Sequence, residues 1–421
     1  MGLRQPHRRT GQAGGPGVSG GRASLGQYLV ITGNYWAFTL TDGALRMLVV
    51  LHFHQLGYSP LQVAMLFLFY EVFGVVTNLV GGWLGARLGL NRTMNLGLLL
   101  QVGALAMLAV PAAMLTVPWV MAAQALSGIA KDLNKMSAKA GVKLLLPPGE
   151  QGRLYRWVAA LTGSKNALKG IGFFLGGLLL SLLGFDGAVL AMAAALGLVW
   201  LASLGLLRRD LGRSSAKPKF TELLSKSPAI NRLSAARLFL FAARDVWFVV
   251  ALPVYFSASL GWSHAEVGSV LALWIIGYGA VQAMAPTFTG RGRQPPGAGA
   301  AFGWALGLAT LTAGLAWALS AAWPPEAVLI GGLLAFGAAF AVNSALHSYL
   351  IVSHAREDGV SLDVGFYYMA NAGGRLLGTV LSGWVFQVAG LAACLWISAG
   401  LLAVSALVAL SLPGSAARPA G

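Results

Sequence analysis

The sequence has few charged residues and almost no cysteine. Only 10% of its 421 residues are charged, whereas soluble globular domains carry about 25%. The single cysteine, Cys394, excludes an internal disulfide framework and a cysteine-based metal cluster. Acidic residues are scarcer than basic ones. The chain has 13 Asp and Glu and 29 Lys and Arg, which gives a net charge of +16. In a soluble protein this excess would suggest a nucleic-acid partner, so the location of the charges has to be settled first.

Apolar residues are abundant and make up 57% of the chain. They come in runs of roughly 18–28 residues, each long enough to cross a bilayer as a helix. The sequence therefore predicts an all-α integral membrane protein with twelve spans. They fall near 28–55, 61–85, 93–115, 117–146, 155–183, 187–207, 233–259, 265–289, 297–320, 326–354, 361–386 and 390–412.

A polar, basic segment at 208–232 divides the spans six and six. We expect a disordered cytoplasmic tail at 1–27, because this stretch is rich in Gly, Ser and Arg and lacks an apolar run of signal-peptide length. The expected organisation continues with a six-helix bundle at 28–207, the cytoplasmic linker, a second six-helix bundle at 233–412 and a cytoplasmic tail at 413–421.

Lys and Arg are distributed unevenly among the connections between spans, which predicts the orientation. The N-terminal tail, the linker and every second connection contain them, whereas the alternate connections hold only Asp186, His264, Glu266 and Glu326. Both termini are therefore expected on the cytoplasmic side of the cell inner (plasma) membrane. This placement accounts for much of the net charge without nucleic acid.

The two halves of the sequence resemble each other. Residues 57–87 align without gaps on residues 261–291. The matched positions are Gly57 with Gly261, Ser59 with Ser263, Val63 with Val267 and Arg87 with Arg291. Together with the six-plus-six count, this favours two pseudo-symmetric bundles related by an axis along the membrane normal.

This organisation resembles the major facilitator superfamily. The stretch GGWLGARLGLNR at 81–92 follows that family's Gly-x-Leu-x-Asp-Arg-x-Gly-x-x-Arg pattern at Gly82, Leu84, Arg87, Gly89 and Arg92. The resemblance implies a gating loop formed by Gly82, Arg87, Gly89 and Arg92. The acidic position of the pattern is Ala86 here, so this residue cannot make the contact that the family's carboxylate makes with another helix.

Charged side chains inside spans cost about 2.5–3.5 kcal/mol each at the bilayer centre, so they must face protein or water. Four lysines recur at every fourth residue of the fourth span and form one stripe about 18 Å long. They are Lys131, Lys135, Lys139 and Lys143. The other charges are Asp42, Arg46, Glu71, Asp132, Lys165, Lys169, Arg237, Arg244, Asp245 and Arg375. None falls on spans three, six, nine or twelve, which are peripheral in the superfamily fold.

Leaving Lys143 aside, the charges named above comprise nine cations and four anions, an excess of five positive charges. Because an uncompensated excess is costly in low dielectric, we expect the missing negative charge to arrive with the substrate. The predicted substrate site comprises Arg46, Lys131, Lys135, Lys139, Lys165, Lys169, Arg244 and Arg375. The acids Asp42, Glu71, Asp132 and Asp245 are candidates for proton coupling or charge pairing.

Some of these charges have simpler explanations. For Lys143 and Arg237 we favour extension of the side chain to the cytoplasmic interface, with Lys143 near bulk water. Asp42 and Arg46 have i,i+4 spacing and could neutralise each other, and Asp132 is expected to pair with a neighbouring lysine. No phosphate-binding loop and no metal-ligand spacing is present, so we predict a gradient-driven transporter without cofactor, not an enzyme.

Longer strings resemble the organoarsenical efflux permeases called ArsJ. They lie at 35–60, 67–85, 127–145 (SGIAKDLNKMSAKAGVKLL) and 157–177 (WVAALTGSKNALKGIGFFLGG). The resemblance implies export of 1-arseno-3-phosphoglycerate, which a glyceraldehyde-3-phosphate dehydrogenase makes from arsenate in the cytosol, and hence arsenate resistance. The dehydrogenase would be a functional partner that supplies substrate. Such an ester carries several negative charges, which Lys and Arg bind.

Other functions stay open. The same fold could import or exchange sugar phosphates or other organic anions, because the sequences of the helices do not determine the direction of transport. A receptor or an anion channel is a further alternative. Export of cationic drugs is disfavoured, since such substrates favour an acidic, aromatic cavity.

Overall fold

The computed structural model describes residues 19–57, 66–147, 149–207, 211, 227–262, 264–289, 296–357 and 359–412, and every regular element in them is helical. The first half contains α1 (Ser19–Gln55), α3 (Leu68–Leu88), α4 (Leu90–Leu108), a short 3-10 turn (Ala112–Met114), α5 (Val117–Leu144) and α6 (Gln151–Leu206). The second half contains α7 (Pro228–Phe248), α8 (Ala251–Ala258), α9 (His264–Thr289), α10 (Ala298–Ser320), α11 (Pro325–His354) and α12 (Val360–Leu410).

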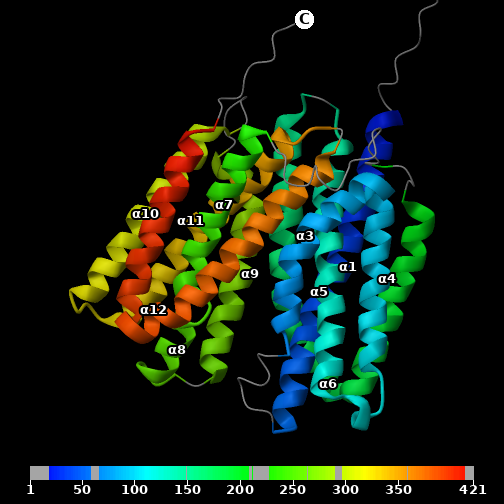
Figure 1. The fold of residues 1–421 in the computed structure, drawn as a ribbon, viewed down its shortest axis with the longest axis horizontal. Helices are drawn as coiled ribbons and strands as arrows, with labels where there is room; N and C mark the ends of the chain where they lie inside the picture. Colours follow the sequence, from blue (N-terminus) through cyan, green and yellow to red (C-terminus); the bar gives the residue numbers. More distant parts are fainter. Residues whose placement is uncertain are drawn as a thin grey trace, which may run out of the picture.

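Two of the helices turn sharply at a glycine and comprise two spans each. Gly184 interrupts α6 with φ of 68°, and Gly390 interrupts α12 with φ of 76°. Glycine adopts positive φ without steric cost. Helices α7 and α8 form one span with a break between them. The described helices therefore make twelve spans in two groups, which lie side by side in Figure 1, and the twelve-span prediction is confirmed.

Six helical segments are long and apolar enough to cross a membrane by length and composition alone. They are α6, α7 with α8, α9, α10, α11 and α12. Helix α5 is not among them, because five charged side chains lie between Lys131 and Lys143. A helix of this composition needs neighbouring helices to shield it from lipid.

Helix α1 begins earlier than the sequence predicts. Residues 19–27, which we expected in the disordered tail, are helical and continue the first span. Gln27 Nε2 donates to the Leu206 carbonyl at 2.8 Å, and the Tyr28 ring stacks on Trp157 with centroids 4.1 Å apart. These contacts hold the start of α1 against α6. The rest of that tail, most of the linker and the predicted C-terminal tail lie outside the described residues.

Close helix crossings repeat in the two halves. In each half, two glycines four residues apart let one helix approach the backbone of another, so that an added Cβ would lie within 2.7 Å of a main-chain carbonyl oxygen. The matched contacts are Gly172 with Leu40 and Gly176 with Ala44 between α6 and α1, and Gly374 with Leu238 and Gly378 with Ala242 between α12 and α7. The repetition agrees with two pseudo-symmetric bundles.

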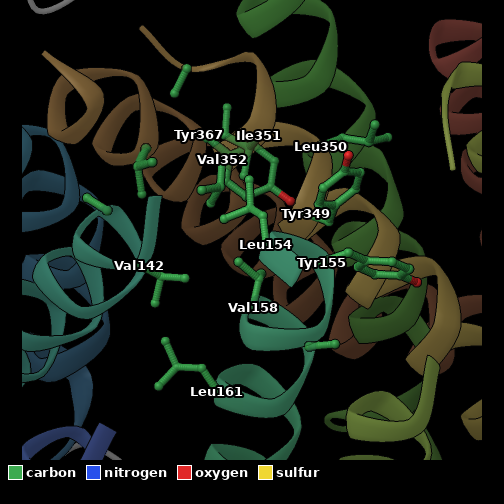
Figure 2. Close-up of a cluster of buried hydrophobic side chains, with 14 of the residues drawn as sticks. Val142, Leu154, Tyr155, Val158, Leu161, Tyr349, Leu350, Ile351, Val352 and Tyr367 are labelled. Atoms are coloured by element: carbon green, nitrogen blue, oxygen red, sulfur yellow. The ribbon is translucent and has the colours of Figure 1, made fainter. Parts of the chain in front are cut away.

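One buried apolar cluster joins the halves at the end of the bundle where α5 ends and α6 begins, which we name the linker end. Its side chains come from α1, α4, α5 and α6 of the first half and from α7, α9, α10, α11 and α12 of the second. Figure 2 shows Leu154, Tyr155 and Val158 of α6 close to Tyr349 and Ile351 of α11. Away from this end, each half has a cluster of its own. The described conformation is therefore closed at the linker end.

Candidate functional site

The cations predicted from the sequence lie on helices that meet between the halves. Most of them are partly exposed within the bundle, namely Arg46 of α1, Lys131 and Lys135 of α5, Lys165 and Lys169 of α6, Arg244 of α7 and Arg375 of α12. Lys165 lies close enough to Lys131, Lys135 and Arg375 for their charges to interact, and Lys169 is similarly close to Arg46 and Arg375. The first half and Arg375 of the second half therefore contribute to one positively charged region.

The α5 cations share a single buried carboxylate. Lys135 Nζ lies 2.5 Å from Asp132 Oδ1, and Lys131 Nζ lies 4.0 Å from Asp132 Oδ2. Asp132 is only 1% exposed. Lys131 also lies over the ring of Tyr70, with Nζ 3.7 Å from the centroid. One carboxylate thus pairs with two ammonium groups, and Lys131, Asp132 and Lys135 together keep a net positive charge.

The α6 cations have less compensation. Among the side chains that the structure describes, no carboxylate lies within 4.0 Å of Lys165 or Lys169. Asp42 is near enough to interact with both through space, but its Oδ1 accepts a hydrogen bond from Tyr70 Oη at 2.7 Å. The two lysines are one helical turn apart and therefore present their charges on the same face of α6.

In the second half, one carboxylate holds two arginines. Asp245 is fully buried and its Oδ1 accepts from Arg244 Nε at 2.6 Å. Its Oδ2 lies 3.4 Å from Arg375 Nε. Both guanidinium groups remain partly exposed, so they can still meet a ligand. The two arginines carry two positive charges against the one negative charge of Asp245. Lys131 and Lys135 stand in the same ratio to Asp132.

The two remaining predicted acids of the first half are Asp42 on α1 and Glu71 on α3. Asp42 is 7% exposed and bound by Tyr70, and the Arg46 guanidinium lies 4.6 Å from the centroid of the same ring. Asp42, Arg46 and Tyr70 thus form a compact group at the α1–α3 contact. The side chain of Glu71 lies outside the described residues, so its proton-coupling role stays a prediction.

Arg237 is buried, so the predicted extension of its side chain to the cytoplasmic interface is wrong. The residue is 3% exposed. Its Nε donates to Asn371 Oδ1 at 2.9 Å and its Nη1 to Ser344 Oγ at 3.1 Å. Sequence patterns on α7 could not reveal this, because both partners come from helices far along the chain.

Lys143, which we expected near bulk water, is partly buried near the end of α5. It donates to the main-chain carbonyl oxygens of Ser353, at 3.1 Å, and Ala355. These oxygens lie at the C-terminus of α11, where the helix dipole favours a cation. Lys143 therefore links α5 to α11 across the closed linker end.

The predicted gating loop makes one contact between the halves. Gly82 of α3 faces the start of α12, where an added Cβ would lie 2.5 Å from the Ser361 carbonyl oxygen and 3.1 Å from Gly365 Cα. Gly89 has φ of 94° and connects α3 to α4. Glycine at 82 is thus explained by a close approach and glycine at 89 by its backbone conformation.

The charged positions of this loop do not lie at the helix contact. Arg87 and Arg92 are exposed, and Arg87 lies 4.9 Å from the centroid of the Trp83 ring. Ala86, which replaces the family's acidic residue, is fully buried. A carboxylate does occur in the first turn of α12, where buried Asp363 accepts from the main-chain nitrogen of Arg356 at 3.1 Å. Asp363 was not predicted from the sequence, although its position soon after Gly359 places an acid in the first turn of a helix.

Comparisons with known proteins agree with this geometry. A family model described as "Major Facilitator Superfamily" matches residues 29–249, and no curated protein sequence matches the chain. The human organic anion transporter MFSD10 (TETRAN) has a similar structure, with a TM-score of 0.72, 17% identity, and coverage of 92% of this chain and 99% of that chain. The E. coli fucose:proton symporter FucP has a TM-score of 0.71, 14% identity, and coverage of 92% and 98%. The proton:xylose symporter XylE has a TM-score of 0.69, 16% identity, and coverage of 93% and 96%.

Proposed function

Because the chain belongs to the major facilitator superfamily, we propose that it exports the anionic organoarsenical 1-arseno-3-phosphoglycerate by alternating access. The superfamily consists of secondary transporters, so the chain is a multi-pass membrane transporter of a small molecule and not an enzyme. The substrate and the direction of transport are the proposed part.

The proposal rests on the charge environment of Lys165 and Lys169. Both lie between the halves, and the described side chains place no carboxylate within 4.0 Å of either nitrogen. Uncompensated cations in a low-dielectric interior are costly. A substrate with two negative groups would supply the missing charge, and Arg375 would let it contact the second half as well.

The chemistry of the cations supports a phosphate or arsenate ester in particular. A lysine ammonium is a point charge that suits a tetrahedral oxyanion, and an arginine guanidinium binds two oxygens of one group as a planar fork. Both kinds of cation line the site, with Lys165 and Lys169 on α6 of the first half and Arg244 and Arg375 on α7 and α12 of the second. An ester with one charged group at each end would fit this division.

The family resemblance supplies the specific substrate. The strings at 127–145 and 157–177, which resemble the organoarsenical permeases, contain Lys131, Lys135, Lys165 and Lys169. In this proposal a glyceraldehyde-3-phosphate dehydrogenase makes the ester in the cytosol, and the transporter removes it across the inner (plasma) membrane with both termini cytoplasmic.

A second candidate is import or exchange of sugar phosphates or other organic anions. It is favoured by the closed linker end, because a bundle closed at that end takes its ligand from the opposite side. If the termini are cytoplasmic, that side is the outside of the cell.

Arsenate tolerance of a sensitive cell tests the proposal. The chain is expressed with and without the dehydrogenase, and growth is measured over a range of arsenate concentrations. Tolerance is expected only with both proteins, and it should be lost in a Lys165→Gln/Lys169→Gln double variant present at the same membrane level. Unchanged growth with both proteins would refute arsenical export, and tolerance without the dehydrogenase would refute the proposed ester as substrate.

A further inference from the structure

Two cations are buried at the linker end and come from opposite halves. Lys139 of α5 and Arg237 of α7 are each 3% exposed. They lie close enough for their charges to repel each other. The described side chains place no carboxylate within 4.0 Å of either one. The closed conformation thus confines two positive charges without a negative partner among these residues.

Two adjacent tyrosines of α12 separate the cations. Lys139 Nζ donates to Tyr368 Oη at 2.5 Å. The Arg237 guanidinium lies 5.3 Å from the centroid of the Tyr367 ring. The two rings meet edge to face with centroids 5.0 Å apart. Neutral phenols can share hydrogen bonds and cation–π contacts with these groups, but they do not cancel the charge.

The surroundings contain polar atoms that lack partners in this conformation. His347 of α11 is fully buried, and neither of its ring nitrogens has a hydrogen-bond partner among the described residues. The hydroxyl groups of Ser348 and Tyr367 are likewise buried, and although Ser348 lies beside both tyrosines, neither hydroxyl makes a hydrogen bond of good geometry with a described residue. His347 and both tyrosines lie within electrostatic range of Arg237. Unsatisfied buried polar groups cost free energy, and solvent or a ligand would satisfy them.

We propose that Lys139, Arg237 and the two tyrosines form a second anion site, which binds a phosphate or arsenate group when the linker end opens. Opening separates the halves, hydrates the cations and exposes them together with the hydroxyl groups. The site lies one turn of α5 beyond Lys135, about 6 Å closer to the linker end. An anion entering there meets it before it reaches Lys131, Lys135 and Lys165.

This inference rests on the proposed function only in requiring that the substrate be an anion. A binding site of this kind gives the buried Arg237 guanidinium a role beyond its hydrogen bonds to Asn371 and Ser344.

Cysteine accessibility can test the site on the full-length protein. The background is Cys394→Ala, which removes the only cysteine. Ser348→Cys then introduces a thiol of similar size beside the two tyrosines. Membrane vesicles with the linker end outward are treated with a membrane-impermeant thiol reagent, with and without inorganic phosphate, and the labelling rate is measured.

We expect labelling from the linker side, and we expect phosphate to slow it by about tenfold. The protection should disappear in Lys139→Gln and in Arg237→Gln, and it should persist in the charge-conserving variants Lys139→Arg and Arg237→Lys. Arg156→Gln is the matched control, because Arg156 is an exposed cation at the same end, and it should keep the protection.

Labelling that phosphate does not slow would overturn the site. The absence of labelling in a variant that still transports would also overturn it, because the site would then never meet solvent. Loss of protection in the charge-conserving variants would show that packing and not charge is responsible. Phosphate protection without arsenate tolerance would refute the proposed substrate and leave the second site standing.

Discussion

Gly163 offers a direct way to open the linker end. It lies where α6 crosses α9, and an added Cβ would come 2.3 Å from the main-chain nitrogen of Ala283 and 2.5 Å from the carbonyl oxygen of Gly279. Both are backbone atoms, so no side chain can rotate away to make room. The next turn of α6 holds a hydrogen bond between the halves, from Asn166 Nδ2 to Gln282 Oε1 at 2.6 Å. Gly163→Ala should therefore penalise the closed conformation.

The magnitude follows from the cost of overpacking. Inserting a methyl group into a tight contact costs about 1–3 kcal/mol. The open conformation separates the two halves at this end and does not bear that cost. The ratio of open to closed molecules should therefore rise by a factor of about 5 to 150, since each 1.4 kcal/mol is tenfold.

Thiol labelling at the apolar cluster measures this ratio. Val158→Cys in the Cys394→Ala background places a thiol at a position that is fully buried when the linker end is closed. Adding Gly163→Ala should raise its labelling rate from the linker side by the factor given above. Gly197→Ala is the matched control on the same helix, because no heavy atom lies within 4 Å of its added Cβ. An unchanged rate in Gly163→Ala, or an equal rise in Gly197→Ala, would refute the reasoning.

Three further predictions concern the charges. Lys131→Gln or Lys135→Gln should reduce substrate efflux about tenfold or more, the equivalent of ~1.4 kcal/mol; normal efflux by Lys131→Gln at a matched membrane level would exclude the α5 stripe as the substrate path. Asp42→Asn should abolish pH-driven accumulation but spare substrate exchange, and unchanged pH dependence would rule out a coupling role. Asp245→Asn removes the carboxylate that pairs with Arg244 and Arg375 and should lower the free energy of unfolding by about 1.5–3 kcal/mol, the range for hydrogen bonds to charged groups, because both guanidinium groups stay partly exposed. Thermal unfolding in detergent measures that loss against the exposed control Asp186→Asn, and equal melting temperatures would contradict it.

The fold could be predicted from the sequence because it follows from the lengths of apolar runs and the positions of their breaks. Gly184, where α6 turns, lies between the predicted spans 155–183 and 187–207. Gly390, where α12 turns, is the first residue of the predicted span 390–412. The start of α1 was misplaced, because a Gly- and Ser-rich stretch has low hydropathy even where it continues a helix.

The candidate site could be predicted only in part. Spacing of four residues places Lys131, Lys135 and Lys139 on one face of α5, and this holds without any knowledge of the neighbouring helices. The partner of each cation could not be predicted, because it depends on which helix packs against that face. Lys143 and Arg237 illustrate this, since their partners lie on α11 and α12.

Substrate accumulation in everted vesicles tests most directly whether Lys165 and Lys169 hold the transported anion. The ester 1-arseno-3-phosphoglycerate is made in the outer medium by the dehydrogenase, and the arsenic retained inside the vesicles is measured over time and substrate concentration. The parent protein should give saturable accumulation, and the Lys165→Gln/Lys169→Gln double variant at the same protein level should give at least about tenfold less. Equal accumulation by the parent and the double variant would contradict the central claim.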